Sequence, residues 1–397
     1  MYRTFIHVDL DAFYCAIEEQ RDPTLRGRPF AVGGQPGERG VVASCSYPAR
    51  HLGVRSAMSM AQALTLCPRL IIVPSRHAAY RAASEQVMSL LRGITPLLEQ
   101  LSIDEAFLDV TTLLRPASAT SQAAAKPDIQ SSDAVPDEAL WMPHTLAEHI
   151  QQRIWQELGL PCSLGIATSK LVAKIATDYG KANTPKRQSP QAICVVAPGE
   201  EAIFIDPLPA TALWGVGPKT AAALAALGIS TIGEIARWPQ QDLIRRFGQH
   251  GYTLSQHARA VDRREIVTVR EAKSVSSETT FSQDVKDWEQ LHATLQELVE
   301  DVAGTLQRRH LQGTTVKLKL RWSDFTTPTR QATLPVPTDA SEVIRTMATQ
   351  LLRQLWMEGQ TVRLMGVGVS GISPIQQLTL WDTKSWDTSN NLTPQPF

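Results

Sequence analysis

Apolar and polar residues alternate with period two in several short segments of the first part of the chain, which predicts β-strands. The first segment, residues 5–10, places aliphatic side chains on one face and His7, Asp9 and Asp11 on the other. The other segments of this kind are residues 41–44, 97–103, 106–111 and 162–167. Helical periodicity predicts helices at residues 12–20, 59–66, 78–92, 145–158 and 169–179, the last ended by Gly180.

Apart from a small lobe at residues 12–74, these elements follow the order β-α-β-β-α-β, the split βαβ plan. In that plan the first and third strands are central neighbours. Asp9 and the adjacent Asp104 and Glu105 should then meet at one edge of one sheet. The same order returns in the C-terminal part, with strands near 275–281, 314–322, 329–334 and 364–370 and helices near 287–310 and 341–356.

The segments outside these two units differ in character. A small helical region spans residues 206–262, and a linker with Arg263, Arg264 and Arg270 follows it. Residues 115–141 are rich in Ala, Ser, Pro, Gln and Asp without any period, so we expect a flexible insertion there.

Composition indicates a soluble globular protein in the cytoplasm. The chain has 397 residues, 43% of them hydrophobic, and no apolar run approaches the ~18 residues of a membrane span. The N-terminus enters a strand directly, without a signal-peptide pattern, and the five cysteines form no CxxC pair. The net charge of zero argues modestly against a nucleic-acid partner, but residues 170–262 carry ten Lys and Arg against seven Asp and Glu.

Carboxylates at the ends of predicted strands carry the strongest chemical signal. Mg²⁺ prefers a few carboxylates plus phosphate oxygens, and two such ions stabilise the attacking and leaving oxygens of a phosphoryl displacement. Asp9, Asp104 and Glu105 suit that role, although Asp104 and Glu105 alone would equally suit an exposed turn. Asp11 should either cap the following helix or support the metal ligands. Asp109 is expected to be structural.

Several basic and aromatic residues could meet a nucleotide near these carboxylates. Tyr14 could stand over a sugar and block a 2′-hydroxyl, or it could pack in the core. Residues 46–50 should form a turn because of their proline, and Arg50 there suits either a phosphate or a surface ion pair. The lysines around one helix suit either phosphate or a solvated basic face; they are Lys170, Lys174 and Lys181.

A glycine hairpin that leads into a helix is predicted at residues 213–227, where Gly215 and Gly217 precede Lys219. Glycines let the backbone approach a phosphate, and the helix N-terminus adds donors. This is the helix-hairpin-helix pattern of sequence-neutral DNA binding, with a degenerate second copy at 246–251. The alternative is an ordinary turn between helices.

Period two also separates basic from apolar residues in the segment 316–322. Lys317, Lys319 and Arg321 share one face, where neighbours lie roughly 7 Å apart, close to the phosphate spacing of one DNA strand. A wet sheet face with random charges is the alternative. Three basic residues in a row without an acid favour binding of a polyanion. Such contacts would position DNA without reading its sequence.

Four motifs in order resemble the Y family of translesion DNA polymerases, in particular its bacterial DNA polymerase IV branch. They are HVDLDAFY at 7–14, YPAR at 47–50, LSIDEA at 101–106 and VAKIA at 172–176. The resemblance, which runs from about residue 4 to 372, implies an α+β multidomain fold shaped like a right hand. The implied domains are a split-βαβ palm (1–11 and 75–168), small fingers (12–74), a helix-hairpin-helix thumb (169–262), a linker (263–273), a β-α-β-β-α-β little finger (274–372) and a tail (373–397).

The resemblance also implies roles for single residues. Asp9, Asp104 and Glu105 would bind two Mg²⁺ ions together with the Leu10 carbonyl, and Tyr14 would be the steric gate against ribonucleotides. The residues that would contact the incoming triphosphate are Tyr47, Arg50 and Lys181. Two departures stand out: Lys181 is followed by Ala-Asn-Thr where the family has Pro-Asn-Gly, and the insertion 115–141 is longer than usual.

The tail contains a segment that resembles the bacterial sliding-clamp peptide, with Trp where Phe is usual. Its contact residues would be Gln377, Leu378, Leu380 and Trp381. We therefore expect a monomer that docks on a clamp ring and uses primer-template DNA and deoxynucleoside triphosphates. No acidic cluster suggests a proofreading exonuclease, so the expected activity is low-fidelity translesion synthesis in DNA repair. The rival hypotheses are a palm-type nucleotide cyclase or phosphotransferase and a non-catalytic DNA-binding repair scaffold.

Overall fold

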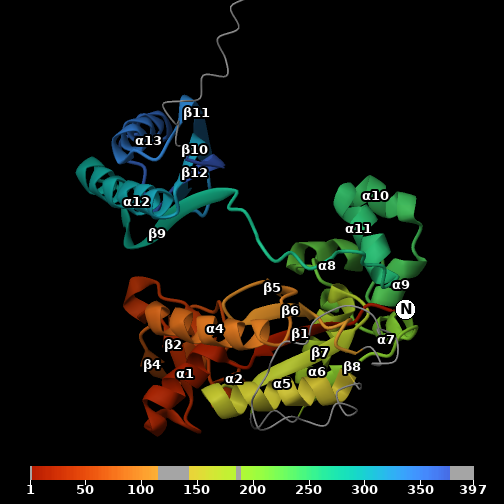
Figure 1. Ribbon diagram of the computed structural model, residues 1–397. Coiled ribbons are helices and arrows are strands. Elements are labelled where there is room, and N and C mark those ends of the chain that lie inside the picture. Colours follow the sequence, from red (N-terminus) through yellow and green to blue (C-terminus); the bar gives the residue numbers. More distant parts are fainter. Residues whose placement is uncertain (1, 115–142, 185–188, 376–397) are drawn as a thin grey trace, which may run out of the picture. The chain divides into compact units, whose positions relative to one another are not determined.

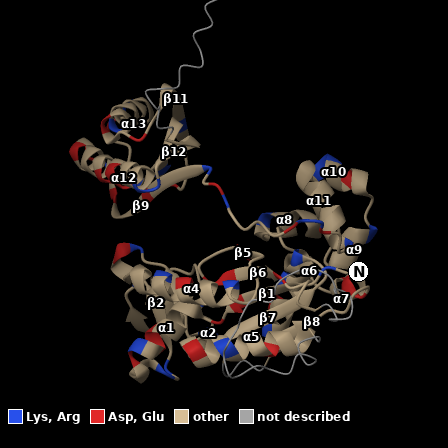
Figure 2. Cartoon of the chain, in the orientation of Figure 1, with Lys and Arg blue, Asp and Glu red and all other residues tan. Residues whose placement is uncertain are grey.

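The computed structural model describes residues 2–114, 143–184 and 189–375. The chain forms two compact units, Met1–Arg270 and Glu271–Phe397 (Figure 1). The predicted insertion and the clamp-like peptide of the tail lie outside the described residues. No helix of the described part has the length and apolar character to span a membrane. Figure 2 shows basic and acidic positions interspersed over both units, in keeping with the net charge of zero.

A five-stranded sheet in the order β5-β6-β1-β7-β8 lies at the centre of the first unit. Its strands are β1 (Phe5–Leu10), β5 (Leu98–Gln100), β6 (Glu105–Asp109), β7 (Cys162–Ala167) and β8 (Ile193–Val195). β1 is antiparallel to both β6 and β7. The predicted first and third strands are thus neighbours, and the register pairs Asp9 with Glu105, as the split βαβ plan requires.

Helices cover both faces of this sheet. The aliphatic face of β1 packs against α4 (His77–Arg92) and α5 (Pro143–Leu158) in one apolar cluster. The other face is covered by α6 (Lys170–Asn183), where His7 is fully buried and its Nδ1 lies 2.9 Å from Thr177 Oγ1. The polar face of β1 is therefore enclosed, and only its end, at Asp9, reaches a pocket.

A smaller lobe contains a three-stranded sheet in the order β3-β2-β4. Its elements are α1 (Phe13–Arg21), η1 (Pro23–Leu25), β2 (Phe30–Gly33), η2 (Pro36–Glu38), β3 (Val42–Cys45), α2 (Tyr47–His51), α3 (Met60–Leu66) and β4 (Ile71–Val73). The turn predicted at residues 46–50 is wrong, because α2 forms there. Pro48 lies in the first turn, where no N–H is needed, and the Ser46 side chain caps the helix by accepting from Ala49 N.

Short helices form the rest of the first unit: α7 (Glu201–Ile205), η5 (Ala210–Ala212), α8 (Pro218–Ala225), α9 (Ile232–Arg237), α10 (Gln240–Phe247) and α11 (Gln249–Ala258). The prediction that Gly180 ends α6 is wrong, since the helix continues to Asn183. A Cβ at Gly180 would lie 3.1 Å from Ala192 Cβ and 3.4 Å from Cys194 Cβ. The glycine therefore serves close packing of α6 on β8, and Lys181 belongs to the last helical turn.

The second unit is a four-stranded antiparallel sheet in the order β11-β10-β12-β9 with two helices. Its elements are β9 (Ser274–Val285), α12 (Trp288–Arg308), β10 (Leu311–Trp322), β11 (Thr329–Thr338), α13 (Ser341–Leu355) and β12 (Val362–Pro374). The predicted element order is confirmed. The pairing differs from the first sheet, however, because the first strand, β9, lies at an edge. The helices bury the face that carries Leu318 and Leu320.

Candidate active site

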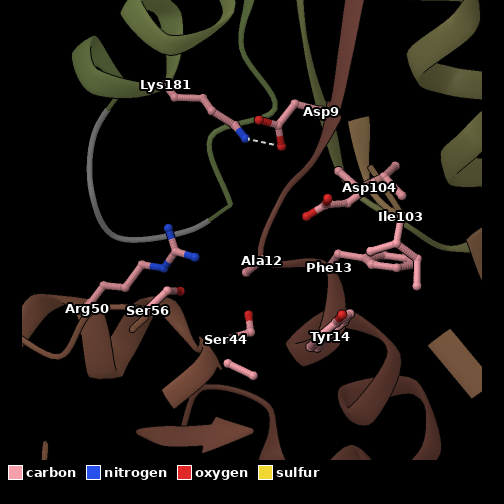
Figure 3. A pocket seen from close by; sticks show the side chains of 12 residues that line it. Asp9, Ala12, Phe13, Tyr14, Ser44, Arg50, Ser56, Ile103, Asp104 and Lys181 are labelled. Carbon is pink, nitrogen blue, oxygen red and sulfur yellow. Dashed lines mark ion pairs between the residues drawn. The ribbon is translucent and has the colours of Figure 1, made fainter. Parts of the chain in front are cut away.

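Carboxylates from two adjacent strands meet at one end of the five-stranded sheet. Asp9 ends β1 opposite Glu105 on β6, and Leu10 N donates to the Asp104 carbonyl at 3.0 Å. Asp9, Leu10 and Asp104 line a cavity of about 300 Å³ together with Tyr14, Arg50 and Lys181 (Figure 3). Two carboxylates and two cations thus face one space that is open enough for a phosphate chain.

The carboxylates interact with lysines of α6. Lys181 Nζ lies 2.6 Å from Asp9 Oδ1, and Lys174 Nζ lies 3.0 Å from Glu105 Oε1. Burial raises the pKa of Glu105, and the nearby Asp9 and Asp104 charges raise it further, against the opposite effect of Lys174. Burial alone would lower the pKa of Lys181, but Asp9 and Asp11 raise it above its usual value.

The donor set fits Mg²⁺, which takes hard oxygen ligands and retains substrate oxygens. Asp9, Asp104 and the Leu10 carbonyl are such donors. Burial is the main cause of the raised pKa of Glu105, and the Asp9 and Asp104 charges add to it; a divalent cation would offset both effects. Among the described residues, no group of three or more His, Cys, Asp and Glu side chains forms a ready-made metal site, since Asp9 and Glu105 face lysines.

Asp11 supports this site and does not cap the helix. Ala12 occupies the N-cap position of α1 in a left-handed conformation with φ 46°, without a side-chain cap hydrogen bond. The Asp11 carboxylate is buried and accepts from Ser163 Oγ at 3.0 Å, Ser189 Oγ at 3.0 Å and Gln191 N at 2.9 Å. It also lies 3.1 Å from Lys181 Nζ. Asp11 therefore joins β1, β7 and the segment before β8, and it fixes Lys181 beside Asp9.

The lysines of α6 are not a solvated basic face. Lys170 is only 3% exposed and donates to Glu99 Oε2 at 2.6 Å, while Lys174 pairs with Glu105. Lys174 and Lys181 lie two helical turns apart, so both point towards the carboxylate end of the sheet. The alternative of a wet basic surface is wrong for this helix.

The two other residues of the triphosphate prediction touch each other, with the Arg50 Cζ 5.1 Å from the centroid of the Tyr47 ring, but they line different cavities. Arg50 lines the cavity of Asp9, and its Nε donates to the Cys45 carbonyl at 3.1 Å, which directs the rest of the guanidinium into the cavity (Figure 3). Tyr47 lines a neighbouring cavity of about 380 Å³ beside Asp11. Burial, above all, raises the pKa of Tyr47, so its hydroxyl remains a donor.

Sequence reasoning missed the contribution of the small lobe to the cavity wall. Ala43, Ser44 and Ser56 line it, and so does Ile103 from the segment between β5 and β6. These small or apolar residues carry no local signal, because nothing in their neighbourhood marks them as facing a ligand. It also missed Tyr80, which stacks on Tyr14 from α4.

The glycine hairpins lie away from this cavity. Gly217 precedes α8, which begins at Pro218 because proline suits the first helical position. Gly215 and Gly248 have positive φ angles of 100° and 60°, and a Cβ at Gly215 would lie 3.7 Å from His250 Cε1. The two predicted hairpin copies are therefore neighbours, with Lys219 exposed beside them.

The basic strand of the second unit has the predicted alternation, with Lys317, Lys319 and Arg321 opposite the buried leucines. An acid is nevertheless present, because Glu278 Oε2 lies 2.8 Å from Lys319 Nζ across Gly366. The glycines of β12 open a groove of about 390 Å³ on this face, lined by Lys317 and Lys319.

Comparison with known proteins identifies close relatives over most of the chain. Residues 8–178 match the impB/mucB/samB family, and residues 272–380 match the C-terminal domain of that family. The DNA polymerase IV of Listeria monocytogenes serotype 4b is 39% identical over 373 residues, which is 94% of this chain and 96% of the relative. The DNA polymerase IV of Halorhodospira halophila is 38% identical over 376 residues, 95% of this chain and 97% of that one.

Solved structures of DNA polymerases share this fold. A Y-family DNA polymerase chimera of Dbh and Dpo4 superimposes with a TM-score of 0.76 at 23% identity, covering 94% of this chain and 99% of that one. An insertion ternary complex of Dbh DNA polymerase gives a TM-score of 0.60 at 23% identity and the same coverage. These likenesses concern the fold.

Proposed function

The chain belongs to the Y family of DNA polymerases, within its DNA polymerase IV branch, and from this premise we propose that Asp9, Asp104 and Glu105 direct its nucleotidyl transfer. It is a DNA-directed DNA polymerase of the low-fidelity, translesion class. The observation that carries the site assignment is the register of β1 and β6, which brings Asp9 opposite Glu105 beside a cavity lined by Asp104.

In the proposed reaction the primer 3′-oxygen bonds to the α-phosphorus of a deoxynucleoside triphosphate. The bond from that phosphorus to the pyrophosphate oxygen breaks, and the hydroxyl proton leaves to solvent. Asp9, Asp104, Glu105 and the Leu10 carbonyl would hold two Mg²⁺ ions, which would lower the pKa of the hydroxyl and neutralise charge on the leaving group. Lys181 and Arg50 bind the triphosphate oxygens from the same cavity. Tyr47 contacts the triphosphate from the neighbouring cavity, and Tyr14 excludes a 2′-hydroxyl.

The proposed domains follow the predicted bounds: palm, fingers, thumb, linker and little finger. The neighbouring glycine turns, with Gly215, Gly217 and Lys219, bind the DNA backbone through N–H groups and charge. Lys317, Lys319 and Arg321 bind it through the open face of the little finger. The enzyme works as a cytoplasmic monomer. The cyclase and scaffold alternatives are disfavoured, because relatives at 38–39% identity over 94–95% of this chain are named DNA polymerase IV.

Primer extension with and without template tests the function. We expect Mg²⁺-dependent addition of the nucleotides that the template specifies, continuing past an abasic site, and no turnover of triphosphate without template. A cyclase or phosphotransferase would consume triphosphate in the absence of template, and a scaffold would show no extension at all. Either result would contradict the proposed reaction.

A sliding-clamp ring is the proposed partner of the tail segment 377–381. Deleting these residues should abolish stimulation of primer extension by added clamp, while basal extension stays within about twofold of the full chain, because the residues that line the catalytic cavity all fall between Asp9 and Lys181. Deletion of residues 387–391, a polar part of the same tail, is the matched control and should leave the stimulation intact. Equal stimulation of the 377–381 deletion and the full chain would remove the tail from this role.

A further inference from the structure

The ring of Tyr14 is backed by a buried tyrosine of another helix. Tyr14 of α1 lines the cavity, and Tyr80 of α4 is fully buried behind it. Their ring centroids are 4.1 Å apart with planes 13° from parallel. His77 meets both rings edge-on, at 6.3 Å from Tyr14 and 6.1 Å from Tyr80. Tyr14 can therefore turn away from the cavity only if Tyr80 also moves.

Tyr80 itself is held by a buried charge. Its hydroxyl donates to Glu18 Oε1 at 2.7 Å, and the Arg76 guanidinium pairs with Glu18 Oε2. The Glu18 side chain is 1% exposed, so both of its oxygens are committed inside the protein. Hydrogen bonds to an ionised group are among the strongest that side chains make, and leaving a buried carboxylate oxygen unpaired is unfavourable. The Tyr80 ring is thus fixed in one orientation.

These contacts form a closed circuit between two helices. Glu18 lies one turn after Tyr14 on α1, and Arg76 and Tyr80 lie at the start of α4. The contacts lead from Tyr14 to Tyr80 by stacking and from Tyr80 to Glu18 by a hydrogen bond, and α1 connects Glu18 back to Tyr14. No part of this network touches Asp9, Asp104 or Lys181 through a hydrogen bond or ion pair found in the described part of the chain. Its effect must therefore be on the wall of the cavity and not on the reacting groups.

We propose that Tyr80, fixed by Glu18 and Arg76, is a positioning residue that sets sugar discrimination by holding the Tyr14 ring rigid. The inference rests on the proposed function, in which Tyr14 excludes ribonucleotides. A binding pocket alone rejects an added hydroxyl poorly, by about 10²-fold. Strong exclusion of ribonucleotides requires that the Tyr14 ring cannot move aside, and Tyr80 restrains it through stacking and through its own hydrogen bond to Glu18.

The test is the ratio of kcat/KM for a deoxynucleotide to that for the ribonucleotide of the same base. Tyr80→Leu should lower this ratio about tenfold or more, because the stacking and the hydroxyl bond are both lost. Tyr80→Phe keeps the ring and loses only the bond to Glu18, so a smaller decrease of about threefold is expected. In both variants kcat/KM for the deoxynucleotide should stay within about threefold of the parent, since no reacting group is changed.

Two parallel variants keep the outcomes distinct. Tyr179→Leu removes a ring that packs on Phe204 away from the cavity, and it should leave the ratio unchanged. Tyr14→Ala should lower the ratio strongly. If Tyr14→Ala admits ribonucleotides but Tyr80→Leu keeps the parent ratio, the positioning role is overturned and the proposed function stands. If Tyr14→Ala keeps excluding them as well, the role of Tyr14 falls together with this inference.

If Tyr80→Leu fails to fold, two milder variants still test the inference. Tyr80→Phe differs from the parent by one oxygen, and Glu18→Gln keeps the side-chain shape while removing the charge that binds Arg76. Both variants should lower the ratio, and parent ratios in both would overturn the inference.

Discussion

Replacing Asp104 or Glu105 with alanine should lower the rate of template-directed extension in Mg²⁺ by about 10³-fold or more. The reason is electrostatic: in the proposed reaction these carboxylates would hold the divalent charge that neutralises the attacking and leaving oxygens. The same loss is expected for Asp9→Ala, because Asp9 lies opposite Glu105 and shares the cavity with Asp104. Single-nucleotide incorporation under single-turnover conditions measures this loss directly.

The matched control is Asp109→Ala on the same strand. Asp109 lies at the other end of β6, opposite Phe5, and its Oδ1 accepts from Thr111 N at 2.9 Å. This variant removes the same charge from the same strand but away from the cavity, so its extension rate should stay within a few-fold of the parent. Its stability should fall by about the contribution of one local hydrogen bond. Mn²⁺ titration provides a readout besides activity: Asp9→Ala and Asp104→Ala should bind Mn²⁺ more weakly than Asp109→Ala. Near-parental extension by both Asp104→Ala and Glu105→Ala would contradict the site.

The meeting of Asp9 with Glu105 could be predicted because it follows from topology. Period-two alternation set the faces of β1, and the split βαβ plan, once assumed, makes the first and third strands neighbours. The element order of the second unit followed from the same reasoning, but its pairing did not. Both arrangements satisfy the same sequence of strands and helices, so the element order alone does not decide which strands are neighbours.

The details that could not be predicted depend on partners distant in sequence. Asp11 has the right place for a helix cap, yet its carboxylate accepts hydrogen bonds from Ser163 on the neighbouring strand β7 and from Gln191 before β8. Gly180 is a plausible helix end, but contact with β8 uses the missing side chain for packing. Lys319 was expected on a face without acids, and Glu278 reaches it only because Gly366 between them has no side chain.

The pair of Lys170 and Glu99 is another contact that the sequence could not predict, since helical periodicity alone could place Lys170 on a surface. Both side chains are only 3% exposed, with Nζ 2.6 Å from Oε2. Glu99 also accepts from Val267 N at 3.0 Å, and Lys170 donates to the Glu265 carbonyl at 2.6 Å. The pair therefore joins β5, α6 and the segment that leads out of the first unit.

Glu99→Ala should destabilise the first unit by about 3–5 kcal/mol, because it leaves the Lys170 ammonium buried without its partner. For a unit of this size the midpoint of thermal unfolding should fall by roughly 6–20 °C. Differential scanning calorimetry of the full chain measures this shift, and limited proteolysis should show faster cleavage near residues 263–270, which lose their contact with Glu99.

Two comparison variants separate the buried charge from the general loss of an acid. Glu157→Ala breaks an exposed pair with Arg153 on α5 and should change the midpoint by only a degree or two, since such pairs contribute about 0.3–0.5 kcal/mol. The double variant Glu99→Leu with Lys170→Met removes both charges and should recover most of the loss. The Glu99→Ala midpoint could instead equal that of Glu157→Ala. Lys170 would then be solvated or paired with another group, and the Lys170–Glu99 pair would not hold residues 263–270 on the sheet.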